Sequence, residues 1–595
     1  AEPRNHIGGP CCEIEEESNM RLSRAMFPVN RKPLWASLVS SVLVVILLAA
    51  CGPNGGLSQT LAVAPALHPG ASPHVKMGGT VIIDNVGGSL WTCGFNPYGP
   101  STAGLAAGIM YEPLVYINPL NNSQRSWLST GYTWGNGNKT LTFSMRPGVK
   151  WSDGKPLTAA DVVFTFNLMK KFSGLDLQAV WTVLSGVRQQ GNKVIFSFKH
   201  PAVPFFYYIA DQNFILPQHI WSKIKNPVTY NDSKPVGSGP FLMKSCSPQD
   251  ITYVRNPNYW QKGKPYISEV RYPAFLDNQP GNLFLAQGKA NWGGQYVPNV
   301  KAYYLSRDTT NRHIWYPPAG SDVLLYLNQT VYPLNIRAVR QAISYGVNRT
   351  KVSQLGVYGY LPPANQLGII QPTWQSWYNK SVGAGYGASY NMAKARTLLK
   401  SAGFTLGSNG IFQKGGKPLS LSLINNSGYT DWVAETALVR DSLRAVGIDV
   451  KLQNVSGNLI TSDTGSGHFQ MVYYSPTGGP TPYYQFRQLL YGANSAPIGQ
   501  TAASNYERYH STAVDNLLDA YAKTSNVAQQ HAIINQIQAV MVRDVPVVPV
   551  LQNVNWFQYD TSQIVGWPTP QNPYAAPAPY DYPDWEVILT TVHQK

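Results

Sequence analysis

The sequence predicts an α/β fold. A strand-like run of β-branched residues occupies residues 80–84 (TVIID) and lies between two glycine pairs. A helix-like segment follows at residues 391–404, with Asn391 as the expected N-cap, apolar residues at helical spacing and a terminating Gly403. A second helix-like segment, residues 431–447, ends at Gly447 directly before a strand-like run. Strands and helices that alternate in this order indicate an α/β architecture.

Other strand-like runs recur along the chain: TLTFSMR (140–146), KVIFSF (193–198), ITYVRN (251–256), DVLLYLN (322–328), LSLSLIN (419–425) and IDVKLQNV (448–455). The charged stretch at 144–166 belongs to this scaffold. Its Pro147-Gly148 and Asp153-Gly154 pairs are turn signals, and Thr158 with Asp161 matches a capping box before an apolar helical stripe. We therefore interpret its charges as turns and a helix cap rather than as a reaction centre.

The composition argues for a large extracellular protein. With 595 residues, several lobes are expected. Only 13% of residues are charged, and the net charge of +16 comes from few acids (30) against 46 scattered bases. Nucleic acid is therefore not an expected partner. The shortage of carboxylates favours an acidic exterior, in which Asp and Glu would lose their ion pairs.

The N-terminal region predicts a secreted, tethered protein. After four basic residues, an apolar run from Leu34 to Ala50 precedes Cys51, and the motif LAAC resembles a bacterial lipobox. We expect a signal peptide at 20–50, lipidation of Cys51 and a flexible Gly/Pro-rich linker at 51–77. The alternative is a membrane-spanning anchor. Residues 1–19 lie upstream of the signal, and Met20 or Met26 is a plausible start.

The sequence contains no catalytic or metal-binding motif. The ten histidines are scattered, and the glycines of GNGNKT (135–140) and GSGP (237–240) lack the spacing of a phosphate loop. We expect no catalytic residue, no metal and no cofactor. Setting aside Cys11, Cys12 and Cys51 leaves Cys93 and Cys246, whose pairing as a disulfide the sequence leaves open.

The block at 140–166 resembles the signature of the family 5 solute-binding proteins of bacterial ABC importers, a group that includes oligopeptide- and dipeptide-binding lipoproteins. Further matches run in family order along nearly all of the chain: YEPLVYINP (111–119), VGSGPFLMKS (236–245), VRNPNYW (254–260), IRAVRQAISYGVNR (336–349), NMAKARTLLKSAGF (391–404) and VPVVPV (545–550).

This resemblance implies a two-lobed periplasmic-binding-protein-like fold of the large class, with a ligand cleft between the lobes. The expected domains are lobe I (78–110, 232–327 and 551–595), an inserted subdomain of lobe I (111–231) and lobe II (328–550). It also implies a monomer that is not an enzyme, and that closes about a hinge on oligopeptides or dipeptides. The partners would be ABC permease subunits with a cytoplasmic ATPase.

The chain departs from the family pattern where acids are expected. Asn291 and Asn348 stand where relatives carry Asp. In FQMVYYSPTGGPTPYYQF (469–486), the Asp that pairs with a peptide's α-ammonium group in peptide-binding members is absent. A buried ammonium group without a counter-charge is costly, which puts the usual peptide anchor in doubt.

Two classes of ligand remain open, peptides and neutral oligosaccharides. A peptide would need another acid, such as Glu112 or Asp431, whereas an oligosaccharide would stack on aromatic rings. Peptide is the preferred expectation because it is the majority ligand of the family. The candidate ligand-binding residues are Trp91, Tyr111, Glu112, Asp431, Trp432, Tyr473, Tyr474 and Tyr483. A surface sensory adaptor and a secreted hydrolase are the alternatives from other classes.

Overall fold

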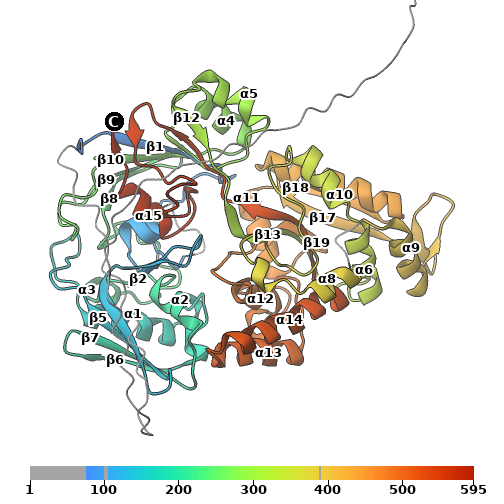
Figure 1. The fold of residues 1–595 in the computed structure, drawn as a ribbon, viewed down its shortest axis with the longest axis horizontal. Helices are drawn as coiled ribbons and strands as arrows, with labels where there is room; N and C mark the ends of the chain where they lie inside the picture. Colours follow the sequence, from blue (N-terminus) through green and yellow to red (C-terminus); the bar gives the residue numbers. More distant parts are fainter. Residues whose placement is uncertain (1–74, 100–104, 387–389) are drawn as a thin grey trace, which may run out of the picture. The chain divides into compact units, whose positions relative to one another are not determined.

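The computed structural model describes residues 75–99, 105–386 and 390–595 (Figure 1). All described residues belong to one compact unit of the chain. The predicted signal peptide, Cys51 and most of the predicted linker lie outside the described residues. At the end of that linker, Lys76 already forms a bridge with Gln594 near the C-terminus.

Lobe I is organised around a seven-stranded mixed sheet with the order β12-β21-β11-β1-β10-β9-β8. The predicted strand at 80–84 is β1, which runs parallel to β10 and β11 in the middle of this sheet. The strands are β1 (Thr80–Asp84), β8 (Phe241–Cys246), β9 (Asp250–Arg255), β10 (Glu269–Pro273), β11 (Trp292–Gly293), β12 (Arg312–Ile314) and β21 (Gln558–Asp560).

A four-stranded antiparallel sheet with the order β4-β5-β7-β6 lies within residues 111–231, the region expected to be an inserted subdomain. Its helix α1 (Ala159–Lys171) begins with the predicted capping box, in which Ala160 N donates to Thr158 Oγ1 and Thr158 N donates to Asp161 Oδ2. The other elements of this region are β2 (Val115–Ile117), β3 (Gln124–Ser126), β4 (Ser129–Gly135), β5 (Thr140–Met145), β6 (Leu184–Gln190), β7 (Lys193–Phe198), α2 (Phe205–Ala210) and α3 (Gln218–Trp221).

Lobe II contains a five-stranded sheet with the order β18-β17-β19-β13-β20. The two predicted helices are present as α9 (Met392–Ser401) and α10 (Thr430–Val446), and the latter ends at Gly447 in the left-handed conformation, with φ of 108°. The strands are β13 (Pro318–Leu327), β17 (Ser420–Asn426), β18 (Asp449–Val455), β19 (Met471–Tyr474) and β20 (Val547–Val554).

The helices of lobe II are α6 (Arg337–Gly346), α7 (Arg349–Lys351), α8 (Lys380–Tyr386), α9 (Met392–Ser401), α10 (Thr430–Val446), α11 (Gly457–Ser466), α12 (Pro482–Leu490), α13 (Thr512–Lys523) and α14 (Val527–Asp544). Lobe I adds α4 (Asn278–Ala286), α5 (Val300–Tyr303), α15 (Asp584–Leu589) and the small strands β22 (Ile564–Val565) and β23 (His593–Gln594). A three-stranded sheet of β14 (Thr405–Leu406), β15 (Phe412–Lys414) and β16 (Lys417–Pro418) completes lobe II.

The expected boundary between the lobes at residue 327 is wrong. Strand β13 pairs with β19 and β20 in the sheet of lobe II, so the chain enters lobe II before Pro318. It returns after β20, which ends at Val554, rather than at residue 550. The resemblance implied that residues 318–327 belong to lobe I, and only the long-range pairing with β19 and β20 assigns this strand to the sheet of lobe II.

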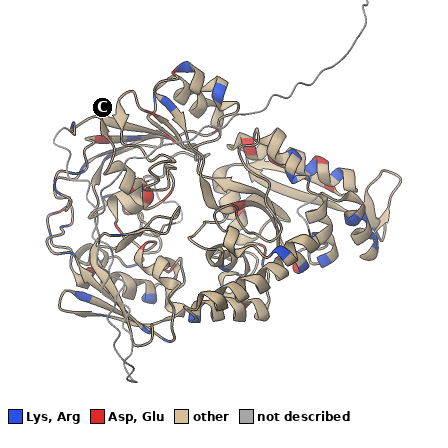
Figure 2. Ribbon diagram, in the orientation of Figure 1, with Lys and Arg blue, Asp and Glu red and all other residues tan. Residues whose placement is uncertain are grey.

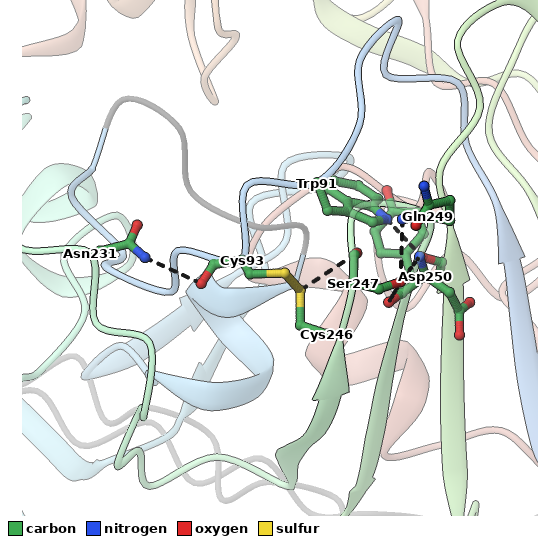
Figure 3. The surroundings of a disulfide bond; sticks show 8 residues. Trp91, Cys93, Asn231, Cys246, Ser247, Gln249 and Asp250 are labelled. Carbon is green, nitrogen blue, oxygen red and sulfur yellow. Dashed lines mark hydrogen bonds between the residues drawn. A yellow bond between two sulfur atoms is a disulfide. The ribbon is translucent and has the colours of Figure 1, made fainter.

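Cys93 and Cys246 are joined by a disulfide bond (Figure 3). The bond connects the segment after β1 to the end of β8 and spans 153 residues of sequence. Nearby, the Asn231 side chain donates to Cys93 O. The disulfide therefore ties two distant segments of lobe I together.

Charged residues are scattered over the elements of both lobes, and most of the ribbon carries neither sign (Figure 2). The ion pairs are few and mostly exposed, such as Lys244–Glu269 at 3.1 Å and Arg444–Asp449 at 3.0 Å. Exposed pairs of this kind contribute about 0–1 kcal/mol each. Apolar and aromatic packing therefore dominates the stability of the fold.

Candidate functional site

Two cavities lie where the lobes face each other. The larger one, called the Asp581 cavity, has a volume of about 500 Å³. Lobe I contributes residues from β2, α2 and the segment 570–584, and lobe II contributes the start of β13 and the turn at 477–479. Its polar and aromatic lining includes Tyr207, Asp211, Gln212, Trp315, Tyr316, Thr477, Gly478, Asn555, Tyr580, Asp581, Tyr582 and Asp584.

The second cavity, called the Asp431 cavity, has a volume of about 330 Å³. It is also built from both lobes, because Asn85, Asn278 and Gln295 come from lobe I and Asn426, Asp431 and Trp432 from lobe II. Its other main lining residues are Tyr296, Tyr429, Tyr474, Ser475, Asn553, Trp556 and Tyr580. Tyr580 lines both cavities, so they are two parts of one interlobe cleft.

Two crossing segments support the floor of this cleft. The chain passes from lobe I to lobe II between β12 and β13, and returns between β20 and β21. Trp315 N donates to Phe557 O at 3.0 Å, and Asn555 N donates to Pro317 O at 2.8 Å, so the two segments are bound to each other. A pair of adjacent crossings of this kind is a suitable hinge for closing one lobe on the other.

The described lining of the cleft contains acidic groups but no basic ones. Aromatic rings, side-chain amides and carboxyl groups are all present, but the described residues that line the two cavities include no Lys, Arg or His. The bases of this strongly positive chain therefore lie elsewhere. A ligand that carries its own negative charge would find no cationic partner in this lining.

Buried carboxyl groups give the Asp581 cavity an acceptor-rich wall. Burial raises the pKa of Asp584 to about 7, although Tyr116 Oη and Ala576 N both donate to its Oδ1, at 2.6 and 2.7 Å. Burial also raises the pKa values of Asp211 and Asp581. Asp581 Oδ2 is buried and has no hydrogen-bond partner within the described residues. A ligand that donates hydrogen bonds would satisfy it.

The Asp431 cavity has a related carboxyl pair behind its wall. Asp431 and Glu435 lie one turn apart on α10, both are buried, and burial raises the pKa of each. Tyr473 Oη donates to Glu435 Oε2 at 2.6 Å, which partly offsets that rise. Only Asp431 of the pair lines the cavity.

Three of the eight predicted ligand-binding residues lie together in the Asp431 cavity: Asp431, Trp432 and Tyr474. The Trp432 and Tyr474 rings are 6.1 Å apart and meet edge to face. The structure also brings the acid-free segment of the sequence to the cleft. Ser475 lines the Asp431 cavity, whereas Thr477 and Gly478 line the Asp581 cavity.

The other five predicted residues do not line either cavity. Trp91 packs on Tyr272 with its Nε1 donating to Tyr272 O, and Tyr111 is fully buried with its hydroxyl bound to Asp232. Tyr473 is buried against Glu435, and Tyr483 stacks on Tyr521 at 4.4 Å within lobe II. Each aromatic ring is used for packing rather than for the cleft.

Glu112 is the fifth of these residues, and its surroundings exclude the role of an exposed peptide anchor. Its Oε1 accepts hydrogen bonds from Trp127 Nε1 at 2.9 Å and Trp260 Nε1 at 2.8 Å. It is fully buried next to Glu586, and this burial raises the pKa of both carboxyls. The pair lies inside lobe I.

The sequence reasoning missed the C-terminal contribution to the cleft. Tyr580, Asp581 and Asp584 all line the Asp581 cavity. The available signal was local acid density, because YDYPDWE (580–586) holds three acids in seven residues of a chain that has 30 acids in 595. No sequence pattern shows that this segment meets β2, since Tyr116 and Asp584 are 468 residues apart.

A cleft between two α/β lobes joined by two adjacent crossings defines the class of two-lobed binding proteins. The family model for bacterial extracellular solute-binding proteins, family 5, matches residues 124–497. The chain belongs to this family. The resemblance and the fold expected from the sequence are therefore confirmed.

Several characterised relatives align with much of the chain. The nickel-binding periplasmic protein of Escherichia coli is 26% identical over 64% of this chain and 72% of its own length. The oligopeptide-binding protein AppA of Bacillus subtilis is 30% identical over 52% of this chain and 57% of its own length. These relatives are substrate-binding proteins, and the chain is accordingly a substrate-binding protein and not an enzyme.

Solved structures give the same result for the fold. The mannohexaose-bound periplasmic oligopeptide-binding protein of Thermotoga maritima superimposes with a TM-score of 0.81 at 26% identity, over 87% of this chain and 98% of its own. The nonapeptide complex of AppA from B. subtilis gives a TM-score of 0.74 at 23% identity, over 88% of this chain and all of its own.

Family 5 binding proteins work outside the cytoplasm, and this places the chain there too. Among the described residues, no helix is long and apolar enough to cross a membrane. The same residues contain no group of three or more His, Cys, Asp or Glu side chains arranged to hold a metal ion.

Proposed function

We propose that this protein is the substrate-binding component of an ABC importer and that its ligand is a neutral oligosaccharide. The proposed ligand class rests on one observation: the described lining of the cleft contains no Lys, Arg or His. Aromatic rings offer flat apolar faces for sugar rings, and the side-chain amides and carboxyls accept or donate hydrogen bonds to hydroxyl groups. A neutral ligand needs no cationic partner.

The position of the aromatic rings supports the same ligand class. Trp432 and Tyr474 in the Asp431 cavity, and Trp315, Tyr316 and Tyr580 around the Asp581 cavity, come from different segments and surround a continuous cleft. The similar structure from T. maritima is described as bound to mannohexaose, which is a neutral oligosaccharide. We therefore prefer oligosaccharide over the peptide expected from the sequence.

An oligopeptide is the second candidate, and one observation favours it. Asp581 Oδ2 is buried without a partner, and Asp431 lines the other cavity without a base beside it. Either carboxylate would pair with a peptide's α-ammonium group and replace the acid that is missing from the segment 469–486. The C-terminal carboxylate of such a peptide would have no base in the described lining.

The wider role follows from the family. We propose that the chain is monomeric, is anchored to the outer face of the cell membrane through lipidated Cys51, and delivers its ligand to permease subunits coupled to a cytoplasmic ATPase. The motif LAAC at 48–51 supports the anchor. Substituting Cys51→Ala should release the protein from the membrane fraction, and the intact mass of the membrane form should include the lipid.

Native mass spectrometry of the purified full chain tests the ligand class directly. We expect a co-purified or added mannose or glucose oligosaccharide to appear as a 1:1 complex, with adducts spaced by one hexose. A peptide ladder in place of the hexose spacing would favour the second candidate. Conversion of the added ligand into products would contradict the binding role.

A further inference from the structure

A cluster of aromatic side chains joins the two lobes beside the Asp581 cavity. Helix α2 belongs to the inserted subdomain and α12 to lobe II. Tyr484 of α12 donates its hydroxyl to Pro204 O at 2.8 Å, across the lobe boundary. Its ring also lies 4.9 Å from the Tyr207 ring and 5.2 Å from the Tyr208 ring. We call Pro204, Phe205, Tyr207, Tyr208, Tyr484 and Arg487 the interlobe clasp.

Arg487 is the cation of this clasp. Its guanidinium carbon lies 5.1 Å from the Phe205 ring centre and 5.4 Å from that of Tyr208, both in the other lobe. The side chain is 4% exposed and forms no ion pair with any described residue. Burying a cation outside an ion pair is unfavourable, and the rings of Phe205, Tyr208 and, within lobe II, Tyr491 offset part of this cost. The contact therefore depends on the two lobes being together.

The clasp is linked to the ligand cavity on both sides. Tyr207, which packs against Tyr484, lines the Asp581 cavity. On the side of lobe II, a Cβ added at Gly479 would lie 2.5 Å from Tyr484 Cβ, so the lining turn 477–479 fits tightly against the same tyrosine. A shift of Tyr484 would thus move both walls of the cavity.

A second interlobe contact lies at the far cavity and provides an independent reporter. Thr430 N donates to Asn278 Oδ1 at 2.7 Å, and Asn278 N donates to Gly428 O at 3.1 Å. Gly428 allows this approach, because a Cβ there would lie 2.6 Å from Leu276 O. We call Leu276, Asn278, Gly428 and Thr430 the glycine seam. It contains no residue of the clasp.

We propose that Tyr484 and Arg487 are positioning residues for the ligand cleft. They hold α2 against α12 and so set the fraction of molecules that adopt the closed form. The proposal deepens the proposed function, because it concerns the regulation of the same cleft. Neither residue lines the two ligand cavities, and both act through Tyr207 and the lining turn.

The first variant is Tyr484→Phe, which removes one hydroxyl and keeps the ring. It breaks the hydrogen bond to Pro204 O and leaves that carbonyl without its partner from lobe II, so the closed form loses stability relative to the open form. We expect the affinity for the oligosaccharide to fall about three- to tenfold, through faster dissociation. Arg487→Lys should act in the same direction because an ammonium group lacks the planar face that stacks on rings.

The matched control is Tyr509→Phe, which also removes one hydrogen-bonded hydroxyl from a buried tyrosine of lobe II. The Tyr509 hydroxyl donates to Asp544 Oδ2 at 3.0 Å, and both residues belong to lobe II. We expect the affinity of this variant, and its hydrogen exchange at 204–212 and 426–432, to equal those of the wild type.

Hydrogen-exchange mass spectrometry of the full chain without ligand separates this proposal from the proposed function. In Tyr484→Phe we expect faster exchange in peptides that cover 204–212 and also in those that cover 426–432 at the glycine seam. The β4–β7 sheet should be unchanged. Faster exchange near α12 alone, with an unaltered seam, would overturn the positioning role. A changed seam in a protein that binds no oligosaccharide would instead overturn only the ligand class.

Discussion

At the scale of single residues, oligosaccharide binding in the proposed cleft depends most on the side chain of Trp432. It was predicted from the sequence, lines the Asp431 cavity and meets Tyr474 edge to face. Truncation to alanine removes a flat apolar surface from the lining without introducing a charge. We expect Trp432→Ala to weaken oligosaccharide binding roughly tenfold, or about 1.4 kcal/mol.

Trp91→Ala is the matched control for this substitution. Trp91 is a half-buried tryptophan of lobe I that packs on Tyr272 and lines neither cavity. Its removal should lower the melting temperature and leave the dissociation constant of the ligand unchanged. Equal losses of affinity in the two variants, measured by calorimetric titration, would argue against the Asp431 cavity as the binding site.

A second prediction at this scale concerns Asp584. Burial raises its pKa to about 7 in the folded protein, against about 3.9 in an unfolded chain. The folded state therefore holds a proton that the unfolded state releases, and Asp584 lowers the stability progressively as the pH rises from about 4 to about 7. Asp584→Asn keeps the Oδ1 acceptor for Tyr116 and Ala576 and removes the titration.

We expect Asp584→Asn to raise the melting temperature at pH 8, by an amount equivalent to about 1 kcal/mol, and to change it little at pH 4. Thermal unfolding followed by circular dichroism at the two pH values measures the difference. Equal destabilisation of the variant at both pH values would contradict the raised pKa, because the loss of stability would then not depend on the titration of Asp584.

At the scale of elements, the sequence predicts those features that short-range chemistry decides. The capping box at Thr158 and Asp161, the N-cap of α9 at Asn391 and the glycine that ends α10 are all local, and all three are confirmed. The membership of β13 was misjudged because strand pairing depends on segments more than 100 residues away. The cleft residues at 580–584 were missed for the same reason.

The capping box allows a test of that local chemistry. Thr158→Ala removes the acceptor for Ala160 N, and a lost N-cap of this kind costs about 1 kcal/mol. Thr397→Ala is the comparison, since Thr397 is exposed within α9 and its hydroxyl only bonds back to Ala393 O.

We expect Thr158→Ala to lower the midpoint of unfolding in denaturant. Thr397→Ala should leave this midpoint unchanged. Neither should alter ligand affinity, because neither residue lines the cleft. A midpoint equal to that of the wild type in Thr158→Ala would show that packing of α1, rather than its cap, decides its stability.

For the whole molecule, buried carboxyls determine the dependence of stability on pH. Burial raises the pKa of many acids in the described chain: Asp84, Glu112, Asp176, Asp211, Asp232, Asp322, Asp431, Glu435, Glu507, Asp581, Asp584 and Glu586. The pKa is lowered only for Asp153, Asp308 and Asp544 among the described acids with a resolved shift. The folded state therefore binds more protons than the unfolded state over most of the range above pH 4.

We expect the melting temperature of the full chain to be higher at pH 5 than at pH 8. The stabilising contribution of these acids is present at low pH and is lost as the pH rises through their folded pKa values. This agrees with the acidic exterior that the composition favours. A differential scanning calorimetry series with its maximum at or above pH 8 would contradict both the sign of these shifts and the acidic habitat.

The central claim is that the interlobe cleft is built for a ligand without negative charge. Isothermal titration calorimetry of the full chain, with a neutral hexasaccharide of mannose or glucose and a uronic-acid oligomer of the same length, tests it most directly. We predict saturable 1:1 binding of the neutral ligand and at least about tenfold weaker binding of the acidic one, because the described lining offers it no base. Equal or tighter binding of the acidic oligomer would contradict the account.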